Sequence, residues 1–169
     1  MSNLYAEYST EGGCAEYIMS LFPEDFTGIC VEVGAYAPFW LSDSWIFQQK
    51  NWDTYCIEPN PKCIPALRNS RTNVYEYACG EKNEDDVDFY IYSYTGESEA
   101  SWTGLIKHPE ARDILVNTVK VKVRTLDWLM ENELKIDHID YLSIDVERDE
   151  MRVLRGTNIS KYNPKVVTL

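Results

Sequence analysis

Two acidic residues stand where apolar segments of the chain end in turns. Glu32 lies in the segment VEVGA at 31–35, and Glu58 lies in IEPNP at 57–61, about one βαβ unit later. Carboxylates at the carboxyl ends of adjacent parallel strands are the groups with which a doubly wound sheet binds a nucleoside cofactor. Glu58 stands where a ribose-binding carboxylate belongs, roughly 20 residues past the first turn.

The turn after the first segment lacks the glycines of a dinucleotide site. The G-x-G-x-x-G pattern lets the backbone approach a pyrophosphate and aims a helix N-terminus at it. Here only Gly34 is present, and Pro38 stands where a later glycine would fall. S-adenosylmethionine has no phosphate, and its sulfonium cation tolerates acidic surroundings. The residues therefore favour an S-adenosylmethionine site. In this site Gly34 allows the turn, Glu32 organises the turn and faces the amino acid end, and Glu58 accepts both ribose hydroxyls.

A third acidic segment, Asp145-Val146-Glu147, ends a later apolar strand at the centre of the same predicted edge. Asp145 or Glu147 could take the proton from a substrate hydroxyl as a methyl group arrives, because an alcohol is hardly ionised at neutral pH. The carboxylates could instead bind a divalent cation such as Mg²⁺, although no motif indicates a metal site. Glu147 has a plainer alternative role, which is to favour the N-terminus of the next helix.

Composition and charge restrict the class of protein. A chain of 169 residues with 44% hydrophobic residues is expected to fold as a single domain over 1–169. Its net charge of −12 argues against a nucleic-acid partner, and its apolar runs are too short for a membrane span. Five Cys without a C-x-x-C pair, only two His and no secretory segment predict a cytoplasmic protein without structural zinc.

Hydrophobic spacing predicts the elements that position these residues. A leading helical segment falls within 1–28, and β-α-β-α-β follows, which predicts an α/β fold with a doubly wound, mostly parallel sheet and helices on both faces. The predicted strands are 29–33, 53–57, 73–78, 87–91, 119–123, 139–144 and one beginning at Lys165. The predicted helices include one capped by Ser42 or Asp43, one capped by Asn60 with Pro61 at its first position, one capped by Thr125, and 148–154.

The segment 93–118 has no strong period, apart from a weak helical pattern near 111–116. A loop of this length inside a compact domain is usually functional, and we predict that it is a lid or substrate loop. Its candidate substrate-binding residues are Ser101, Trp102 and His108. The alternative for His108, which precedes Pro109, is an ordinary surface histidine.

In these residues the chain resembles the FkbM-like family of S-adenosylmethionine-dependent methyltransferases. The likeness rests on motifs in the expected order over 8–169: VEVGAY at 31–36, LSDS at 41–44, NW at 51–52, IEPNP at 57–61, ACG at 78–80, VRTLD at 123–127, IDYLSIDVE at 139–147 and LRG at 154–156. The resemblance implies a class I, Rossmann-like methyltransferase fold and transfer to a hydroxyl of a sugar or natural product. The cofactor-binding residues would then be Glu32, Gly34, Ala35, Tyr36, Glu58, Pro59, Ala78 and Cys79, with Asp145 and Glu147 at the transfer site.

The chain departs from the family pattern in two places. Relatives usually have Asp-Val-Glu-Gly where this chain has Arg148 in the fourth position. Arg148 could bind an acidic acceptor, pair with a neighbouring Asp, or mark an altered function. The sequence also lacks the last two strands of a seven-stranded class I sheet after the strand at Lys165. We therefore expect either that the sequence is a fragment of a longer chain or that a partner, such as a second copy in a homo-oligomer, covers the exposed edge.

The resulting prediction is an enzyme that methylates an oxygen on a sugar or other small-molecule or glycan acceptor, without a nucleic-acid or membrane partner. Three alternatives remain from the sequence. The first is a non-catalytic S-adenosylmethionine-binding or scaffolding module, which Arg148 favours. The second is a nicotinamide dehydrogenase, which the absent glycine fingerprint disfavours. The third is N-methylation of a small molecule, because the fold does not specify the acceptor atom.

Overall fold

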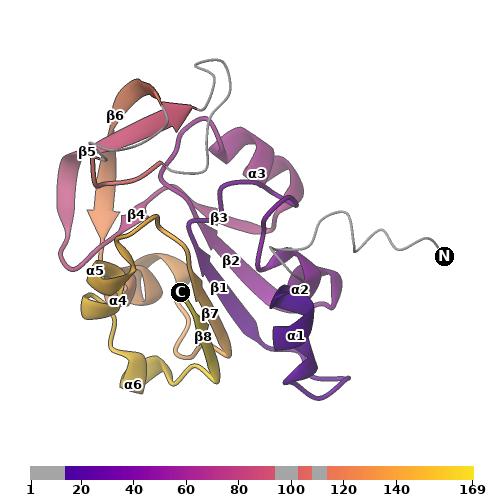
Figure 1. Cartoon of the computed structure of the whole chain (residues 1–169). Coiled ribbons are helices and arrows are strands. Elements are labelled where there is room, and N and C mark those ends of the chain that lie inside the picture. Colours follow the sequence, from indigo (N-terminus) through magenta and orange to yellow (C-terminus); the bar gives the residue numbers. More distant parts are fainter. Residues whose placement is uncertain (1–13, 94–102, 108–113) are drawn as a thin grey trace.

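The computed structural model describes residues 14–93, 103–107 and 114–169 (Figure 1). Five parallel strands form the main sheet in the order β3-β2-β1-β7-β8. These strands are β1 (Ile29–Val33), β2 (Asp53–Ile57), β3 (Asn73–Tyr75), β7 (Tyr141–Ile144) and β8 (Val166–Thr168). Because β1 pairs with β2 on one side and β7 on the other, the carboxyl ends of all three strands meet at the centre of one edge.

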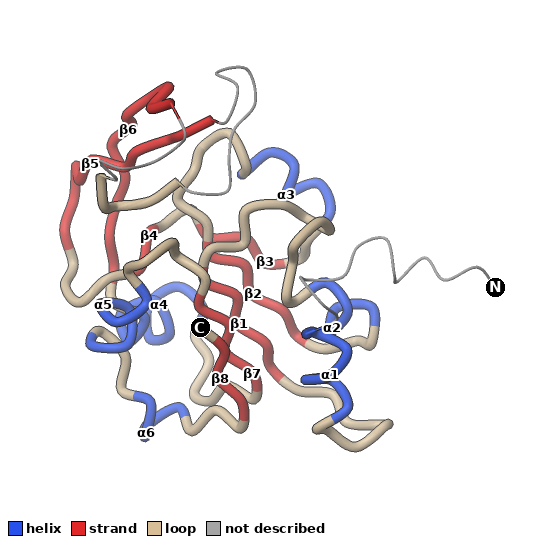
Figure 2. Tube along the Cα trace, viewed as in Figure 1, coloured by secondary structure: helices blue, strands red, loops and turns tan. Residues whose placement is uncertain are grey.

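Helices cover both faces of this sheet (Figures 1 and 2). On one face lie α1 (Cys14–Ser20), α2 (Trp45–Gln49) and α3 (Ile64–Ser70). On the other lie α4 (Leu126–Leu129), the π-helical turn η3 (Met130–Leu134) that continues it, α5 (Glu150–Arg155) and α6 (Ile159–Tyr162). The arrangement confirms the predicted doubly wound α/β fold.

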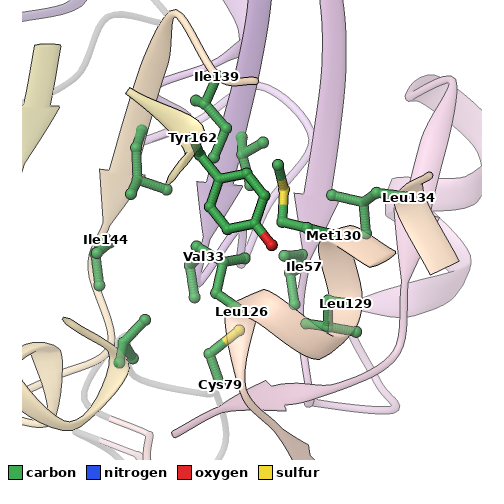
Figure 3. Close-up of a cluster of buried hydrophobic side chains, with 13 residues drawn as sticks. Val33, Ile57, Cys79, Leu126, Leu129, Met130, Leu134, Ile139, Ile144 and Tyr162 are labelled. Atoms are coloured by element: carbon green, nitrogen blue, oxygen red, sulfur yellow. The ribbon is translucent and has the colours of Figure 1, made fainter. Parts of the chain in front are cut away.

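The two faces have separate cores because side chains alternate along each strand. From β1, Val31 and Val33 pack on the side of α4, η3 and α6, whereas Cys30 packs on the side of α1 and α2. Figure 3 shows the first of these cores, with the buried ring of Tyr162 at its middle. Each fully buried aliphatic or aromatic side chain there stabilises the fold by roughly 1.5–3 kcal/mol.

A second, smaller sheet stands beyond the carboxyl ends of the main strands (Figure 1). It consists of β4 (Ala78–Cys79), β6 (Ile114–Arg124) and β5 (Glu84–Ser93) in the order β4-β6-β5. β5 and β6 are antiparallel, and Gly104 forms an isolated bridge with Tyr90 of β5. This bridge holds the segment 103–107 beside β5 and over the edge where the main strands end.

Several predicted boundaries are correct, and others change. The bounds 29–33 and 53–57 match β1 and β2, and Thr125 caps α4 by accepting a hydrogen bond of 3.1 Å from the Trp128 amide. The strand predicted at 73–78 is instead split between the two sheets. The chain turns at residues 76–77, where the Tyr77 amide bonds back to the Tyr75 carbonyl, so β3 and β4 cannot form one strand.

The predicted loop at 93–118 is shorter in the structure, and the weak helix near 111–116 is wrong from Ile114 onward. Ser93 ends β5, and residues 114–118 belong to β6, where their partners on β5 override the local pattern. Residues 111–113 lie outside the described residues. Whether the remaining segment acts as a lid stays a prediction.

Two predicted helix caps are also wrong. The N-cap of α2 is Ser44, and the hydroxyls of Ser42 and Ser44 both donate to Glu32, while neither accepts a capping hydrogen bond from the helix amides. Helix α3 begins at Ile64, because the Asn60 side chain accepts from the Lys62 amide and caps the preceding turn. The buried Glu32 carboxylate is therefore the reason that α2 lacks a side-chain cap.

None of the helices in the described part of the chain combines the length and hydrophobicity that crossing a bilayer requires. Strand β8 lies at one edge of the five-stranded sheet. The predicted association of two copies through that edge stays a prediction.

We expect Gly34→Ala to destabilise the fold severely. Gly34 has a φ of +92°, and a Cβ there would lie 1.8 Å from the Asp145 carbonyl oxygen, so β1 and β7 would have to separate. The free energy of unfolding should fall by about 3 kcal/mol or more, and Tm by roughly 6–12 °C. Thermal unfolding followed by circular dichroism measures the change.

Gly104→Ala is the matched control for this substitution. The nearest atom to a Cβ at residue 104 is the Val146 carbonyl oxygen at 3.6 Å, which is an ordinary contact. Its free energy of unfolding should change by less than about 1 kcal/mol. Equal Tm values for Gly34→Ala and wild type would contradict the close approach of β1 and β7.

Candidate active site

A pocket opens where β1, β2 and β7 end, beneath the smaller sheet and the segment 103–105. Its walls are partly apolar, from strand-end residues and Phe89, and partly acidic. The lining residues are Val33, Gly34, Tyr36, Leu41, Ile57, Glu58, Pro59, Tyr77, Ala78, Cys79, Phe89, Thr103, Gly104, Leu105, Asp145, Val146, Glu147 and Asp149.

The turn after β1 creates this opening. The Gly34 amide donates to the Ile57 carbonyl at 2.9 Å, which continues the β1–β2 ladder one residue beyond β1. On the other side, the Asp145 amide donates to the Val33 carbonyl at 2.9 Å. The chain therefore leaves the sheet between its two neighbours, and the space above the three strand ends is left for a ligand.

The Glu58 carboxylate is fixed by backbone amides on both sides. Its Oε2 accepts from the Tyr36 amide at 2.8 Å, and its Oε1 accepts from the Asn60 amide at 2.7 Å. The residue is only 4% exposed, yet it lines the pocket. A carboxylate can accept about four hydrogen bonds, and these two amides fix the orientation of this one at the pocket wall. Such a group is preorganised to accept from a ligand diol.

Glu147 is an acid in this pocket whose pKa lies close to neutral pH. Burial, and next the Asp145 carboxylate, raise its pKa from the ordinary 4.5 to about 7. The Glu150 carboxylate adds to this increase, and Arg148 opposes it. Asp145 is exposed, whereas Glu147 is half-buried. A base with a pKa near the working pH is the most effective kind, so Glu147 is chemically suited to accept a proton.

Asp149 is an acidic pocket residue that the sequence analysis missed. It is 4% exposed, and burial raises its pKa, while its ion pair with Arg152 at 3.2 Å opposes that increase. It stands at the N-cap of α5. The signal that could have revealed it is an Asp directly before a helix and three residues before an Arg.

The backbone after β7 is strained. Glu147 and Arg148 have φ values of +56° and +77°, a region that side chains other than glycine rarely adopt. Each such residue costs about 1–3 kcal/mol, and strain of this kind gathers at functional sites. Arg148 thus takes a backbone conformation that glycine adopts more readily, at the position where the resemblance noted in the sequence implies glycine.

The pocket brings together most of the residues predicted from the sequence. Those that line it are Gly34, Tyr36, Glu58, Pro59, Ala78, Cys79, Asp145 and Glu147. Binding of a ligand by each of them stays a prediction.

Other predicted residues lie elsewhere. Glu32 is buried beneath the loop 36–44, and Ala35 packs against Cys56 and Leu67 on the α3 side of the sheet. Arg148 is exposed and does not line the pocket, and its amide donates to Glu150. The candidates Ser101, Trp102 and His108 lie outside the described residues.

Within residues 14–93, 103–107 and 114–169, no three His, Cys, Asp or Glu side chains gather as a metal ion would require. The fold and pocket define a class, the Rossmann-like α/β proteins that bind a ligand at the carboxyl edge of a parallel sheet.

A comparison with protein families assigns this chain within that class. The family described as Methyltransferase FkbM domain matches residues 32–169. The chain therefore belongs to this family and is a methyltransferase domain with a class I fold, which confirms the resemblance found in the sequence. No curated protein and no solved structure gives a match.

We expect Glu147→Gln to become stabilising relative to wild type as pH rises. At low pH, Glu147 is protonated in both the folded and the unfolded chain. Between its ordinary pKa of 4.5 and its raised pKa of about 7, the unfolded chain releases the proton first, so wild type loses stability. Tm measured by scanning fluorimetry at about pH 5 and about pH 8 tests this.

The matched control is Glu76→Gln, because Glu76 is exposed beside Arg68. Its difference in Tm from wild type should stay nearly constant across the same pH range. A constant difference for Glu147→Gln as well would contradict the raised pKa of Glu147.

Proposed function

We propose that this domain uses S-adenosylmethionine to methylate a hydroxyl oxygen of a sugar or other small molecule. The observation that carries the proposal is Glu58, a buried carboxylate that two backbone amides aim into the pocket that also holds Glu147. Membership of a methyltransferase family supports the cofactor class. The acceptor is inferred from the chemistry of the acidic end of the pocket.

The pocket residues fit the parts of S-adenosylmethionine. Glu58 would accept from the ribose hydroxyls, and the apolar walls near Ile57, Cys79 and Phe89 would hold the adenine. At the end of the pocket beside β7, Asp145, Glu147 and Asp149 provide acidic surroundings that suit the sulfonium cation. When bound, the cofactor supplies an electrophilic methyl group on a sulfonium. The β1 turn has no glycine-rich phosphate cradle, which disfavours a dinucleotide.

The acidic end of the pocket suits an acceptor hydroxyl. Glu147, with a pKa near 7, can take the proton of an alcohol that is being methylated. Asp145 stands beside it and can accept from a neighbouring hydroxyl, which would orient a polyol such as a sugar. The segment 103–105 covers this end of the pocket, so the acceptor would bind beneath it.

Calorimetric titration tests the cofactor directly. We expect wild type to bind S-adenosylmethionine and S-adenosylhomocysteine but not NAD. Glu58→Ala should weaken both adenosyl ligands by about 10- to 100-fold, since a hydrogen bond to a charged group contributes about 1.5–3 kcal/mol. The control Glu76→Ala removes an exposed carboxylate that follows the neighbouring strand β3, and it should leave both affinities unchanged.

No binding of either adenosyl ligand by wild type would overturn the proposed cofactor. Binding without turnover on any hydroxyl or amine compound would instead support a non-catalytic module. Turnover on amines alone would replace O-methylation with N-methylation.

The pH dependence of methyl transfer tests the role of Glu147. Once an acceptor has been identified, kcat for its methylation should rise with pH and level off above about 7, because Glu147 must be deprotonated to act as the base. Glu147→Gln should lower kcat by about 10²–10⁴-fold without changing the affinity for S-adenosylhomocysteine. Asp145→Asn, at the exposed neighbour, should have a smaller effect. An unchanged kcat in Glu147→Gln would mean that positioning alone drives the transfer.

A further inference from the structure

The loop 36–44, between β1 and α2, shapes one wall of the pocket. Its residues Tyr36 and Leu41 line the pocket, and both have left-handed backbones, with φ values of +41° and +57°. The Tyr36 amide is one of the two donors that orient Glu58. A strained loop keeps such a shape only if its surroundings fix it. The groups that fix it lie beneath the loop and outside the pocket.

Glu32 is the first of these groups. Its carboxylate is 3% exposed and points from β1 to the underside of the loop. Oε1 accepts from the Asp43 amide at 2.6 Å, and Oε2 accepts from the hydroxyls of Ser42 at 3.1 Å and Ser44 at 2.5 Å. One buried carboxylate thus holds three consecutive residues at the end of the loop.

Arg71, just after α3, approaches the same residues from the other side. Its side chain has no exposed surface, and its Nη1 lies 3.9 Å from Glu32 Oε2. Nη1 donates to the Pro38 carbonyl at 3.1 Å and to the Ser42 hydroxyl at 2.8 Å, and Nη2 donates to the Ser44 hydroxyl. The guanidinium therefore contacts the middle and the end of the loop at once.

Three further contacts fix the orientation of this arrangement. Nε of Arg71 donates to Gln48 Oε1 at 2.9 Å, and the guanidinium stacks over the Trp45 ring at 5.7 Å, so α2 holds it in place. At the far side, the Ser143 hydroxyl of β7 donates to the Asp43 carboxylate. The loop is consequently tied to β1, α2, α3 and β7.

We propose that Glu32 and Arg71 form a buried clamp that holds the loop 36–44 in the conformation needed to bind the adenosyl cofactor. The inference rests on the proposed function, since the cofactor is the ligand whose affinity the clamp sets. Neither residue lines the pocket, so both are positioning residues that act through Tyr36, Leu41 and the Tyr36–Glu58 hydrogen bond. Glu32 would thereby act by organising the loop, as one part of the sequence prediction has it, rather than by the direct cofactor contact that the other part expects.

Energetics support a positioning role over a purely stabilising one. Burial raises the pKa of Glu32, and the Arg71 guanidinium opposes that increase, so the pair carries a large desolvation cost. Buried ion pairs are often no more stabilising than apolar groups of the same size, but they select one geometry. Here the selected geometry includes the left-handed backbone conformations of Tyr36 and Leu41, which a less constrained loop would not keep.

The test compares Arg71→Met and Ser42→Ala with wild type, and Arg68→Met is the matched control. Arg68 lies on α3, one turn before Arg71, and forms an exposed ion pair with Glu76. S-adenosylhomocysteine is the probe, titrated by calorimetry well below Tm. Arg71→Met should weaken it by about 10-fold or more and Ser42→Ala by about 3-fold, while Arg68→Met changes it by less than about 2-fold.

Amide hydrogen exchange without ligand gives the readout that a purely structural role would not produce. In Arg71→Met and Ser42→Ala, the amides of Tyr36 and Asp43 should exchange faster, while the amides of β1 and β7 keep their protection. Ser42→Ala keeps both charges, so it stays informative if Arg71→Met does not fold. Faster exchange across the whole sheet, with unchanged affinity for the probe, would overturn the clamp.

The two proposals fail in different ways. If wild type does not bind S-adenosylhomocysteine, the proposed cofactor is wrong and the clamp loses its ligand. If wild type binds and all three variants bind as tightly, only the clamp is overturned.

Discussion

The Asp145 carbonyl oxygen occupies the space that a side chain at residue 34 would need, and the rest of the site depends on this close approach. The close approach of this oxygen to residue 34 requires glycine just after β1, and Gly34 has a positive φ there. The turn sends the chain away from the sheet between β2 and β7, so the ends of three parallel strands are left uncovered. The pocket is the space above them, and its acids are the residues that follow those strands.

Two carboxylates near this turn have different tasks because strand side chains alternate between faces. Glu32 lies within β1 and points to the face covered by α1, α2 and α3, where it binds the underside of the loop 36–44. Glu58 lies just beyond β2 and points into the pocket, where the loop's first residue donates to it. One acid therefore shapes the loop, and the other uses the amide that the shaped loop presents.

Much of the fold and part of the site could be predicted from the sequence. The bounds of β1 and β2 followed from short apolar runs with turn residues at their ends, and both are confirmed. The gathering of Gly34, Glu58 and Glu147 in one pocket followed from the rule that parallel strands end at one edge. The family was recognised from the order of several short motifs, and the match over residues 32–169 confirms it.

The remaining features depend on contacts between distant parts of the chain. The pairing of β5 with β6 spans a long intervening segment, and local patterns around Ile114 gave no sign of it. The position of Arg71 beneath the loop depends on how α3 packs, and no motif surrounds it. The direction of the Glu32 side chain depends on how β1 packs in the sheet, and its partner Ser42 had the appearance of a helix cap in the sequence.

The most direct test of the account is a crystal structure of this domain with S-adenosylhomocysteine bound. The account predicts that the ligand lies in the pocket above β1, β2 and β7, with its ribose hydroxyls bonded to Glu58 and its amino acid end beside the Gly34 turn. The loop 36–44 should keep its backbone, because Glu32 and Arg71 already hold it. Ligand density outside this pocket, or a ribose that makes no contact with Glu58, would contradict the central claim.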